Sequence, residues 1–460
     1  MTPTSTAVED VAVRDETIVA LGPPGSLGDA ATVIDAHGCL VLPGGVDPHV
    51  HYGLDFGVVK AEGADYSPAA AYGGTTTVVD FALQQPPTSL HDAVAAKRAE
   101  AEGTMAVDYA LHAIVAGPDV SFEVVEEIGD LVRAGIPTIK LFMTYGWMVD
   151  DGEMWAVMTE TAAHGGMVVL HAEDDAIARR LAATYVRQGK TEGAYIVETR
   201  PPLVEEAAIR RALLLAERSG CLVYVLHIAA GSAVHALAEA RARGIPVYGE
   251  TLTPYLSFTG DQLWENPLVN NYPVPKYAED QAVLWQALAD DRLQAVGSDH
   301  FSTTRADHYA MGDTVDSMMA GHANVELRLP VLFHLGVQEG RIGLSRFVEI
   351  VSANPAKLMG LYPRKGSLAP GSDADLVVLD PNRRWTIRAE ELHMRADYSC
   401  WEGWELRGKV VTTVLRGQVL VREERFVGPT GGGRFLERRL DTPPDRAGTF
   451  ESRGAAAPVS

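Results

Sequence analysis

Short runs of β-branched and apolar residues alternate along most of the chain with longer stretches in which Ala, Leu, Glu and Arg follow a helical period. Over residues 44–365 this alternation predicts repeated strand–helix units around a parallel sheet. Eight strands are expected, at residues 44–51, 75–81, 106–115, 138–143, 167–171, 222–227, 246–250 and 293–299. Eight such units predict an α/β fold, a (β/α)8 TIM-type barrel with insertions in its loops.

The two ends of the chain follow a different pattern. Strands are expected at residues 11–22, 32–42, 374–379 and 409–421, with few helical stretches between them. Each end alone has too few strands to bury an apolar face, so we expect one small β-sandwich built from both. The predicted organisation is residues 1–43 and 366–428 for the sandwich and 44–365 for the barrel. Residues 429–460 form a tail that we expect to be partly mobile or held in oligomer contacts.

Composition and charge exclude several classes of protein. The chain has 61 acidic and 39 basic residues and a net charge of −22, which disfavours nucleic acid and anionic membrane as partners. No run of about 18 apolar residues is present to span a bilayer. The three cysteines exclude a disulfide framework, and the first residues do not form an export signal. We therefore expect a cytoplasmic protein.

Chemically competent side chains lie at the ends of five predicted strands. In this fold the carboxyl ends of the strands form the functional rim of the barrel. The side chains are His49 and His51, Lys140, His171, His227 and Asp299. Because residues two apart on a strand share a face, both imidazoles of the His49–His51 pair can reach one ion.

The His-x-His spacing gains its meaning from the other rim residues. With this histidine content, about 0.4 such pairs are expected by chance, so the spacing alone is weak evidence. Two further histidines and an aspartate at the same rim supply nitrogen and oxygen donors suited to zinc or a similar divalent ion. We therefore predict a metal centre, and we expect His300 to orient Asp299 through a hydrogen bond.

Lys140 lies in an apolar strand, where a buried ammonium group needs a partner. One interpretation is a structural salt bridge. The other is that desolvation and nearby cations lower its pKa from about 10.4, which frees the amine to take up CO2 as a carbamate. A carbamate is an oxygen-donor anion that bridges two metals. The sequence alone leaves both open.

The motifs around these residues resemble the dihydropyrimidinase and hydantoinase branch of the amidohydrolase superfamily. The resemblance spans nearly the whole barrel and sandwich. The matching segments include Leu42-Pro-Gly-Gly-Val-Asp-Pro-His-Val-His51, Ile139-Lys-Leu-Phe-Met-Thr-Tyr145, Leu170-His-Ala-Glu173, Val247-Tyr-Gly-Glu-Thr251, Gly297-Ser-Asp-His300 and Asn354-Pro-Ala-Lys357.

The resemblance implies a centre with two Zn²⁺ per subunit, for which Mn²⁺ or Co²⁺ are possible substitutes. One ion is held by His49, His51, carboxylated Lys140 and Asp299, and the other by Lys140, His171 and His227. It further implies that a metal-bridging hydroxide attacks a ring carbonyl, that Tyr145 donates its hydroxyl to the carbonyl oxygen, and that Asp299 acts as base and then acid. The product is an N-carbamoyl amino acid.

The substrate is expected to be a hydantoin, a dihydropyrimidine or a similar cyclic ureide or imide. Residues 52–57 contain no arginine of the kind that dihydroorotases use to bind the substrate carboxylate, which disfavours that activity. Expected substrate contacts are Tyr145, Leu54, Phe56, Trp147, Tyr272 and Ala320. Tyr272 and Ala320 stand where the family has other residues, in Tyr272-Pro-Val-Pro-Lys276 and Met319-Ala-Gly321, so ring preference is expected to differ.

Two other functions remain open. One is an allantoinase-like or other cyclic-imide amidohydrolase, and the other is a catalytically silent scaffold of the same fold. All six expected ligand positions are filled, which argues against the scaffold. We expect a homo-oligomer, either a dimer or a tetramer, because relatives commonly assemble.

Overall fold

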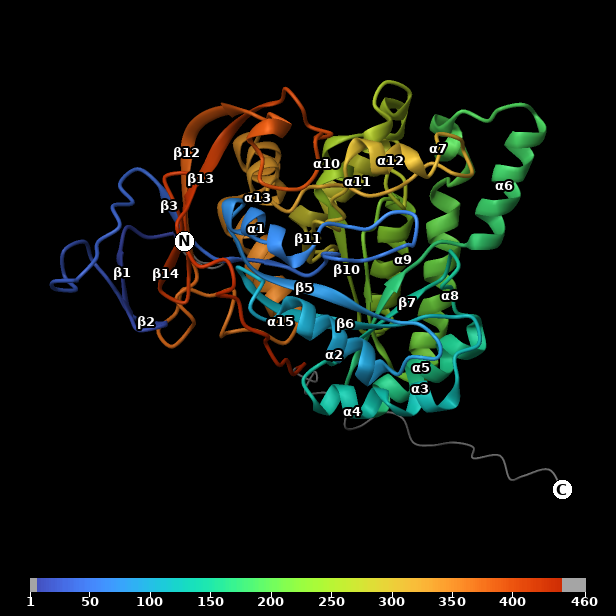
Figure 1. The fold of residues 1–460 in the computed structure, drawn as a ribbon, viewed down its shortest axis with the longest axis horizontal. Helices are drawn as coiled ribbons and strands as arrows, with labels where there is room; N and C mark the ends of the chain where they lie inside the picture. Colours follow the sequence, from blue (N-terminus) through green and yellow to red (C-terminus); the bar gives the residue numbers. More distant parts are fainter. Residues whose placement is uncertain (1–5, 441–460) are drawn as a thin grey trace.

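The computed structural model describes residues 6–440 and contains a parallel eight-stranded barrel surrounded by helices (Figure 1). Its strands follow one another around the sheet in the order of the sequence. They are β4 Gly45–Asp47, β5 Thr75–Gln84, β6 Asp108–Val115, β7 Thr138–Phe142, β8 Met167–His171, β9 Leu222–Val225, β10 Val247–Leu252 and β11 Ala295–Gly297. The predicted (β/α)8 barrel is confirmed.

Helices cover the outside of the barrel and also form short turns in its loops. The long ones are α2 Leu90–Ala101, α5 Asp151–Ala163, α6 Asp175–Arg187, α8 Pro202–Ser219, α9 Gly231–Ala242 and α11 Ala278–Ala289. The short ones are α1 Pro68–Tyr72, α3 Phe122–Glu126, α4 Ile128–Arg133, α7 Ile196–Thr199, α10 Thr253–Ser257, α12 Arg305–Ala310, α13 Arg328–Leu332, α14 Leu344–Val348 and α15 Asn354–Leu358. No helix within residues 6–440 has both the length and the apolar character needed to cross a membrane.

The seam between the first and last barrel strands is closed by a buried arginine. The ladder runs from β11 to β4 and does not join these two strands within the described residues. Arg328 lies between them and donates from Nη1 to the carbonyl oxygens of Val46, at 3.2 Å, and Val296, at 2.9 Å. The Ser298 amide donates to Asp47 Oδ1 at 3.1 Å across the same seam. This closure brings the residues after β4 beside those after β11.

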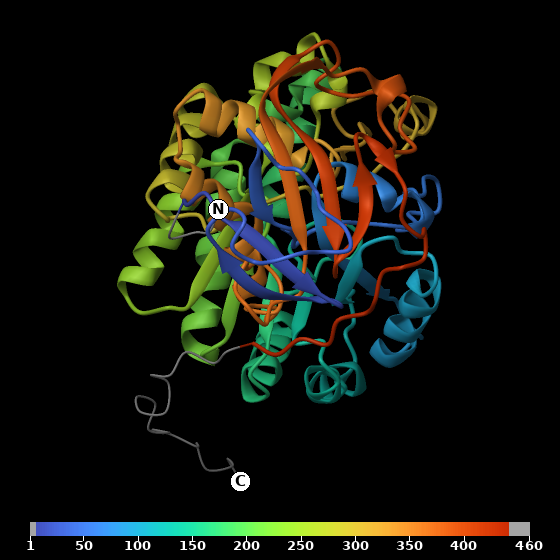
Figure 2. The same cartoon turned by 90° about the vertical axis from the view of Figure 1, so that its left-hand side faces the viewer.

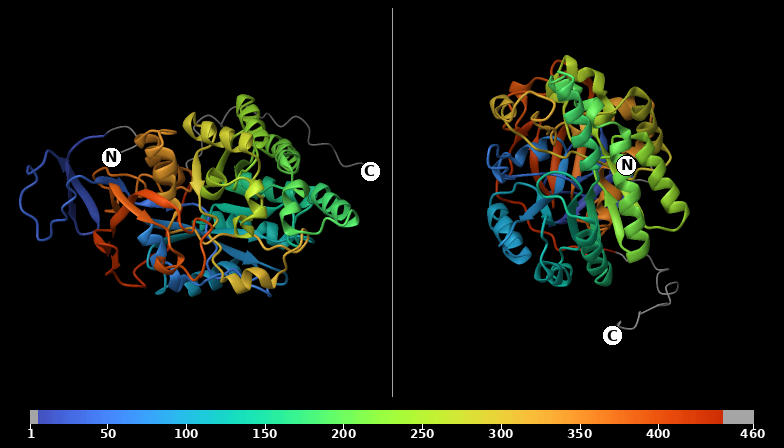
Figure 3. Two further views of the ribbon diagram at one scale, coloured as in Figure 1. Left: turned by 90° about the horizontal axis from the view of Figure 1, so that it is seen from above. Right: turned by 90° about the vertical axis from the view of Figure 1, so that its right-hand side faces the viewer.

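Strands from both chain ends form the second part of the molecule (Figure 2). A five-stranded antiparallel sheet contains β3 Leu40–Pro43, β12 Leu376–Thr386, β13 Glu405–Leu415, β14 Gln418–Arg422 and β15 Arg425–Phe426. The N-terminal strands β1 Asp10–Arg14 and β2 Thr17–Gly22 form a separate antiparallel hairpin. The hairpin and helix α6 lie at opposite ends of the molecule (Figure 3).

One predicted strand of this sheet is much shorter than expected. Residues 32–42 were predicted to be extended throughout, but only Leu40–Pro43 pairs in the sheet. The preceding residues form turns, because Asp35 Oδ1 accepts from the His37 amide at 2.9 Å and Ala36 O accepts from Cys39 N at 3.0 Å. Such side-chain to backbone bonds compete with a strand ladder.

The first part of the C-terminal tail packs against the barrel of its own chain. The Tyr109 amide donates to Arg434 O at 3.0 Å, and Leu436 N donates to Tyr109 O at 2.7 Å. Leu436 and Arg438 are both buried, and Arg438 donates to Thr138 Oγ1 at 2.6 Å. The rest of the predicted tail, positions 441–460, lies outside the described residues, so the mobility expected there stays a prediction.

A buried cluster of charges joins the barrel to the antiparallel sheet. The Lys365 Nζ lies 2.6 Å from Asp108 in β6, 2.9 Å from Asp373 and 2.8 Å from Asp375, just before β12. Lys365 is 1% exposed, and its removal leaves the buried carboxylates of Asp108 and Asp375 with Arg416 as their remaining cation, which pairs with Asp108. Asp373 is half-buried and keeps its ion pair with Arg364 at 3.0 Å. Breaking a buried ion pair from one side typically lowers stability by about 3–5 kcal/mol.

We therefore expect Lys365→Met to lower the free energy of unfolding by about 3–5 kcal/mol, measured by urea denaturation at pH 8. The loss should shrink toward pH 5, because carboxylates without their cation take up protons more readily. The control Lys357→Met removes an exposed lysine and should change stability by less than about 0.5 kcal/mol. An equal loss in both variants would contradict the prediction.

Candidate active site

The six predicted ligand residues meet at the carboxyl-terminal rim of the barrel. His49 and His51 follow β4, Lys140 lies in β7, His171 ends β8, His227 follows β9 and Asp299 follows β11. All six side chains are buried, with exposed fractions between 1% and 8%. The parallel strands place these residues at one edge of the sheet, because five of them end a strand or follow it within four residues and Lys140 lies within β7.

The first group is a tight triangle of donor atoms. His49 Nε2 lies 3.1 Å from His51 Nε2, and both nitrogens lie 3.0 Å from Asp299 Oδ1. Ligand atoms around a cation at about 2.1 Å are separated by similar distances, about 3.0–3.4 Å. His49, His227 and Asp299 also offer ligand atoms within 4.8 Å of one another. The residues present therefore fit a divalent metal ion.

The second group adds two more imidazoles beside the first. The ring centroids of His171 and His227 are 4.4 Å apart, and those of His49 and His227 are 5.3 Å apart. Burial lowers the pKa of His171 and of His51 to about 4, so both rings are neutral at physiological pH. Metal binding requires neutral imidazole, so these rings are ready to act as ligands.

Lys140 lies among these groups, and no carboxylate of residues 6–440 bonds to it directly. Its Nζ sits 4.3 Å from the centre of the Phe142 ring. Burial lowers the pKa of Lys140 to about 7, although Asp299 and Glu250 act in the opposite direction. Desolvation is one of the two causes expected from the sequence. A neutral amine is the form that reacts with CO2.

Backbone strain gathers at the same place. Tyr145, His227 and Asp299 have φ angles of 69°, 39° and 50°, in the left-handed region that non-glycine residues rarely adopt. Such conformations are each unfavourable by roughly 1–3 kcal/mol and tend to cluster at active sites. His227 and Asp299 belong to residue types that adopt this region more often than most, but nothing in the sequence marks these particular positions.

Tyr145 stands over the second imidazole group. Its ring centroid is 5.0 Å from that of His171 and 5.7 Å from that of Tyr272. Burial raises the pKa of the Tyr145 hydroxyl well above its ordinary value, which keeps the proton on the oxygen. A protonated phenol in this position can donate a hydrogen bond to a ligand bound at the rim.

Carboxylates that the sequence analysis quoted without assigning a role support the ligand residues. Glu250 Oε1 lies 2.6 Å from His49 Nδ1, and Glu173 Oε2 lies 3.0 Å from His171 Nε2. Arg200 Nη1 pairs with the same Glu173 oxygen at 2.9 Å. For Glu173 a sequence signal existed, since it stands two residues after His171. Glu250 is 201 residues from His49, and only the fold brings them together.

The predicted hydrogen bond from His300 to Asp299 is not the one that the structure contains. His300 Nε2 pairs with Glu62 Oε1 at 2.7 Å, and His300 Nδ1 accepts from the Asn324 amide at 3.1 Å. Asp299 Oδ2 instead accepts from Asn271 Nδ2 at 3.0 Å. Asn271 thus fixes the carboxylate, and the sequence analysis did not identify it.

Comparison with known proteins connects this site to one family. The model of the amidohydrolase family matches residues 40–420. The chain belongs to the amidohydrolase family. It is 40% identical to a D-hydantoinase of Streptomyces coelicolor, covering 93% of this chain and 94% of the relative, and 39% identical to a D-hydantoinase of Rhizobium radiobacter, covering 94% and 95%.

Solved structures agree with these relatives. The crystal structure of dihydropyrimidinase from Brevibacillus agri matches with a TM-score of 0.91 and 36% identity, covering 96% of this chain and 98% of the other. An L-hydantoinase (dihydropyrimidinase) from Arthrobacter aurescens matches with a TM-score of 0.89 and 32% identity, covering 95% and 97%. Amidohydrolases depend on metal ions, and the His/Asp cluster at the rim is consistent with that.

Aromatic and apolar side chains form a wall beside the amidohydrolase centre. Phe56 is 49% exposed and stacks on Trp147 with ring centroids 5.1 Å apart. Leu54 is buried against Phe301 and Met319, so packing accounts for its position. The Tyr272 hydroxyl donates to Met318 O at 2.9 Å. Ala320 is half-buried in the same segment, directly after Met319.

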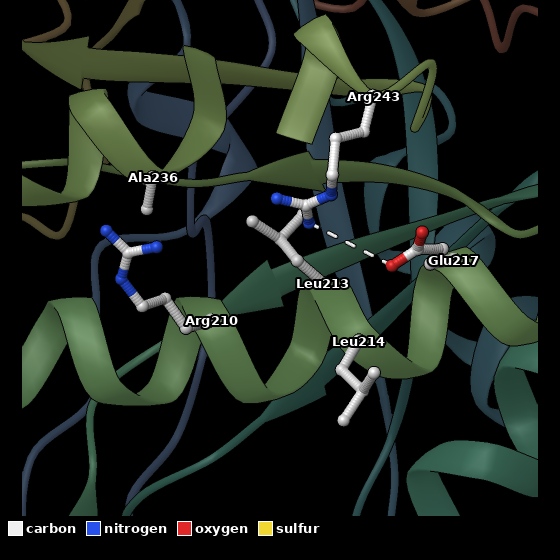
Figure 4. Close-up of a pocket in the computed structure, with 6 residues that line it drawn as sticks. All are labelled: Arg210, Leu213, Leu214, Glu217, Ala236 and Arg243. Carbon is white, nitrogen blue, oxygen red and sulfur yellow. Dashed lines mark ion pairs between the residues drawn. The ribbon is translucent and has the colours of Figure 1, made fainter. Parts of the chain in front are cut away.

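A hollow of about 240 Å³ lies away from the amidohydrolase centre, on the outer helices α8 and α9 (Figure 4). Its two arginines already have acidic partners. Arg243 is 3.9 Å from Glu217, and Arg210 pairs with Glu206 at 2.8 Å and Glu239 at 2.7 Å. The charges are satisfied within the surface, so this hollow offers no free group for chemistry.

Proposed function

We propose that this amidohydrolase opens the ring of hydantoins, dihydropyrimidines or a similar cyclic ureide or imide. With a hydantoin or a dihydropyrimidine the product is the N-carbamoyl amino acid. The observation that carries the proposal is the triangle of His49 Nε2, His51 Nε2 and Asp299 Oδ1, with separations of 3.0–3.1 Å, on the rim of a barrel. The relatives named D-hydantoinase and dihydropyrimidinase support the substrate class.

Two divalent cations, preferably Zn²⁺ with Mn²⁺ or Co²⁺ as substitutes, would complete the site. His49, His51 and Asp299 would hold one, His171 and His227 the other, and Lys140, carboxylated by CO2, would contribute to both. When bound, such cations lower the pKa of water toward about 7 and polarise a carbonyl group. The low pKa of Lys140 supports the carboxylation.

Asp299 is placed to move the proton of the reaction. Burial raises the pKa of Asp299, but His49 and His51 outweigh it and hold the pKa well below its usual value. The carboxylate is therefore ionised and can take a proton from the attacking water. With Asn271 fixing one oxygen, the same group can deliver that proton to the ring nitrogen that leaves.

Tyr145 is placed to stabilise the oxygen of the carbonyl under attack. Donors that are fixed before the reaction stabilise developing negative charge and typically contribute 10²–10³-fold to the rate. We expect Tyr145→Phe to lower kcat by about 10²-fold with little change in KM, measured with a 5-substituted hydantoin. Tyr185→Phe, on helix α6, is the control and should leave both constants unchanged. A Tyr145→Phe effect confined to KM would contradict this role.

The aromatic surface of this wall, and the lack of a free arginine beside it among the described residues, favour a substrate whose ring carries an apolar substituent. Phe56, Trp147 and Tyr272 present aromatic surface, and Leu54 and Ala320 complete the expected contacts. Arg200 lies 4.4 Å from the Tyr272 ring but is paired with Glu173, so it is not free to bind a substrate carboxylate. This agrees with the argument against dihydroorotate.

The direct test is a panel of ring substrates assayed with added Zn²⁺. It contains 5-substituted hydantoins, dihydrouracil, allantoin and a succinimide-type imide. Turnover of a hydantoin or of dihydrouracil supports the main substrates proposed, and turnover of only allantoin or the imide shifts the assignment to an allantoinase-like or other cyclic-imide amidohydrolase. No turnover of any of them would contradict it. The same preparation should behave as a dimer or tetramer in light scattering.

A further inference from the structure

The two predicted cation positions share an arrangement that the proposed reaction does not by itself require. In each, one imidazole has a buried glutamate on the ring nitrogen that points away from the other ligands. His49 Nδ1 lies 2.6 Å from Glu250 Oε1, and His171 Nε2 lies 3.0 Å from Glu173 Oε2. Both glutamates are 0% exposed. A carboxylate here fixes the tautomer and orientation of the ring.

The other imidazole of each pair has no such support. Within the described residues, His51 Nδ1 and His227 Nδ1 are buried and have no hydrogen-bond partner. Each pair therefore combines one imidazole ring held by a carboxylate with one ring that has no carboxylate partner, although Glu250 Oε1 also accepts from the backbone amide of His227 at 3.4 Å. Each predicted cation position therefore has one imidazole whose tautomer and orientation are fixed by a carboxylate.

The two glutamates select different nitrogens. Because Glu250 binds Nδ1 of His49, the nitrogen left toward the other ligands is Nε2, which lies 3.0 Å from Asp299 Oδ1. Glu173 binds Nε2 of His171 and leaves Nδ1. A neutral imidazole has one N–H and one lone pair, so the nitrogen that donates to the carboxylate decides which nitrogen can bind a cation.

The partners of the two glutamates differ in charge. Glu250 Oε2 accepts from the Tyr224 hydroxyl at 2.9 Å, and a Cβ on Gly297 would lie 2.7 Å from that oxygen, so the neighbouring strand leaves room for it. Glu173 instead pairs with the Arg200 guanidinium at 2.9 Å. Because a guanidinium draws more of the carboxylate charge than a phenol does, Glu173 has less to give to its imidazole.

We propose that Glu250 and Glu173 are positioning residues that select Nε2 of His49 and Nδ1 of His171 as cation-binding atoms. Their unequal partners add to the inequality of the two ligand sets, and the position that contains His49 binds its cation more tightly. The inference rests on the proposed function, since it presupposes the pair of cations. It adds the order in which the two positions bind their cations, and it assigns one carboxylate to the imidazole ring of His49 and another to that of His171.

The test is a titration of the full-length, metal-depleted protein with Co²⁺ in bicarbonate buffer, followed by visible absorption and calorimetry. Wild-type protein should bind in two distinguishable steps. Glu250→Gln should weaken the tighter step by ten- to a hundredfold, and Glu173→Gln should weaken only the looser one. Neither the absorption nor the calorimetric measurement depends on turnover. Equal weakening of both steps by either variant, or no weakening, would overturn the inference.

Two further variants separate this role from simple packing. Glu205→Gln changes another buried glutamate, which accepts from the Ala229 amide and contacts no predicted ligand, and should leave both steps as in the wild type. Tyr224→Phe removes a donor but keeps the carboxylate of Glu250, so the tighter step should be as tight as before or tighter. A looser step in Tyr224→Phe would show that packing is responsible, even if Glu250→Gln did not fold.

The outcome also distinguishes this inference from the proposed function. Wild-type protein that binds no Co²⁺ and opens no ring would contradict the proposed function. Two normal steps in the wild type that persist unchanged in Glu250→Gln would remove the inference and leave the proposed function intact.

Discussion

Lys140→Ala is expected to abolish ring opening, with kcat/KM reduced by at least about 10⁴-fold, since it removes the side chain proposed to serve both cations. Lys140 is fully buried in β7, and burial lowers its pKa to about 7, so much of the amine is neutral and can react with CO2 near physiological pH. The variant should also retain fewer than two divalent ions per chain. Elemental analysis of the purified protein and a hydantoin assay measure both effects.

The carboxylation is tested separately from the loss of a lysine. Metal-depleted wild-type protein should regain activity with Zn²⁺ faster in bicarbonate buffer than in CO2-free buffer, and Lys140→Ala should show no such difference. Lys97→Met removes another buried lysine, which lies 3.0 Å from Asp80. We expect it to lower stability while the folded molecules keep their full metal content. Full activity of Lys140→Ala would contradict the proposed site.

The rim positions of most side chains proposed as ligands could be predicted from the sequence, because these residues end or closely follow an apolar run. A barrel strand appears as an apolar run, and a polar residue directly after it must lie at the rim. His171 shows this, since β8 Met167–His171 was predicted with the bounds that the structure has. The same reasoning located Asp299, although the strand before it is only Ala295–Gly297.

The groups that support those ligands could not be predicted, because no local pattern marks them. Asn271 reaches Asp299 across 28 residues and Glu250 reaches His49 across 201. In the sequence alone, Asn271 and Glu250 each look like an ordinary polar residue. His300 was assigned to Asp299 because the two are adjacent in sequence, whereas the fold pairs it with Glu62, 238 residues away.

The limits of the fold prediction have a similar origin. The strand expected at residues 44–51 is only Gly45–Asp47. Beyond it a single bridge pairs Val50 with His300, and Arg328 bonds to the strands on both sides of the seam. A buried arginine at the start of helix α13 gives no sign in the sequence that it bonds to two strands. Side-chain bonds over long separations determine both the seam and the site.

Asp299→Asn is expected to lower kcat by about 10³–10⁴-fold, because an amide cannot take up the proton that the carboxylate is proposed to move. The change keeps the volume of the side chain and one oxygen that can face His49 and His51. Much of the metal content and the fold should therefore survive, although the lost charge will weaken binding of the cation beside it. Steady-state kinetics in excess Zn²⁺ separate the loss of proton transfer from the loss of metal.

A matched buried aspartate provides the control for this substitution. Asp280→Asn changes a side chain on helix α11 that is 7% exposed. It accepts from the Gly231 amide at 2.7 Å and is not among the residues proposed for the active site. It should leave kcat within about twofold, since an amide oxygen still accepts that bond. If Asp299→Asn in excess Zn²⁺ were as active as Asp280→Asn, proton transfer would have to occur without this carboxylate. The strained backbone at Asp299, with φ of 50°, would then serve metal geometry alone.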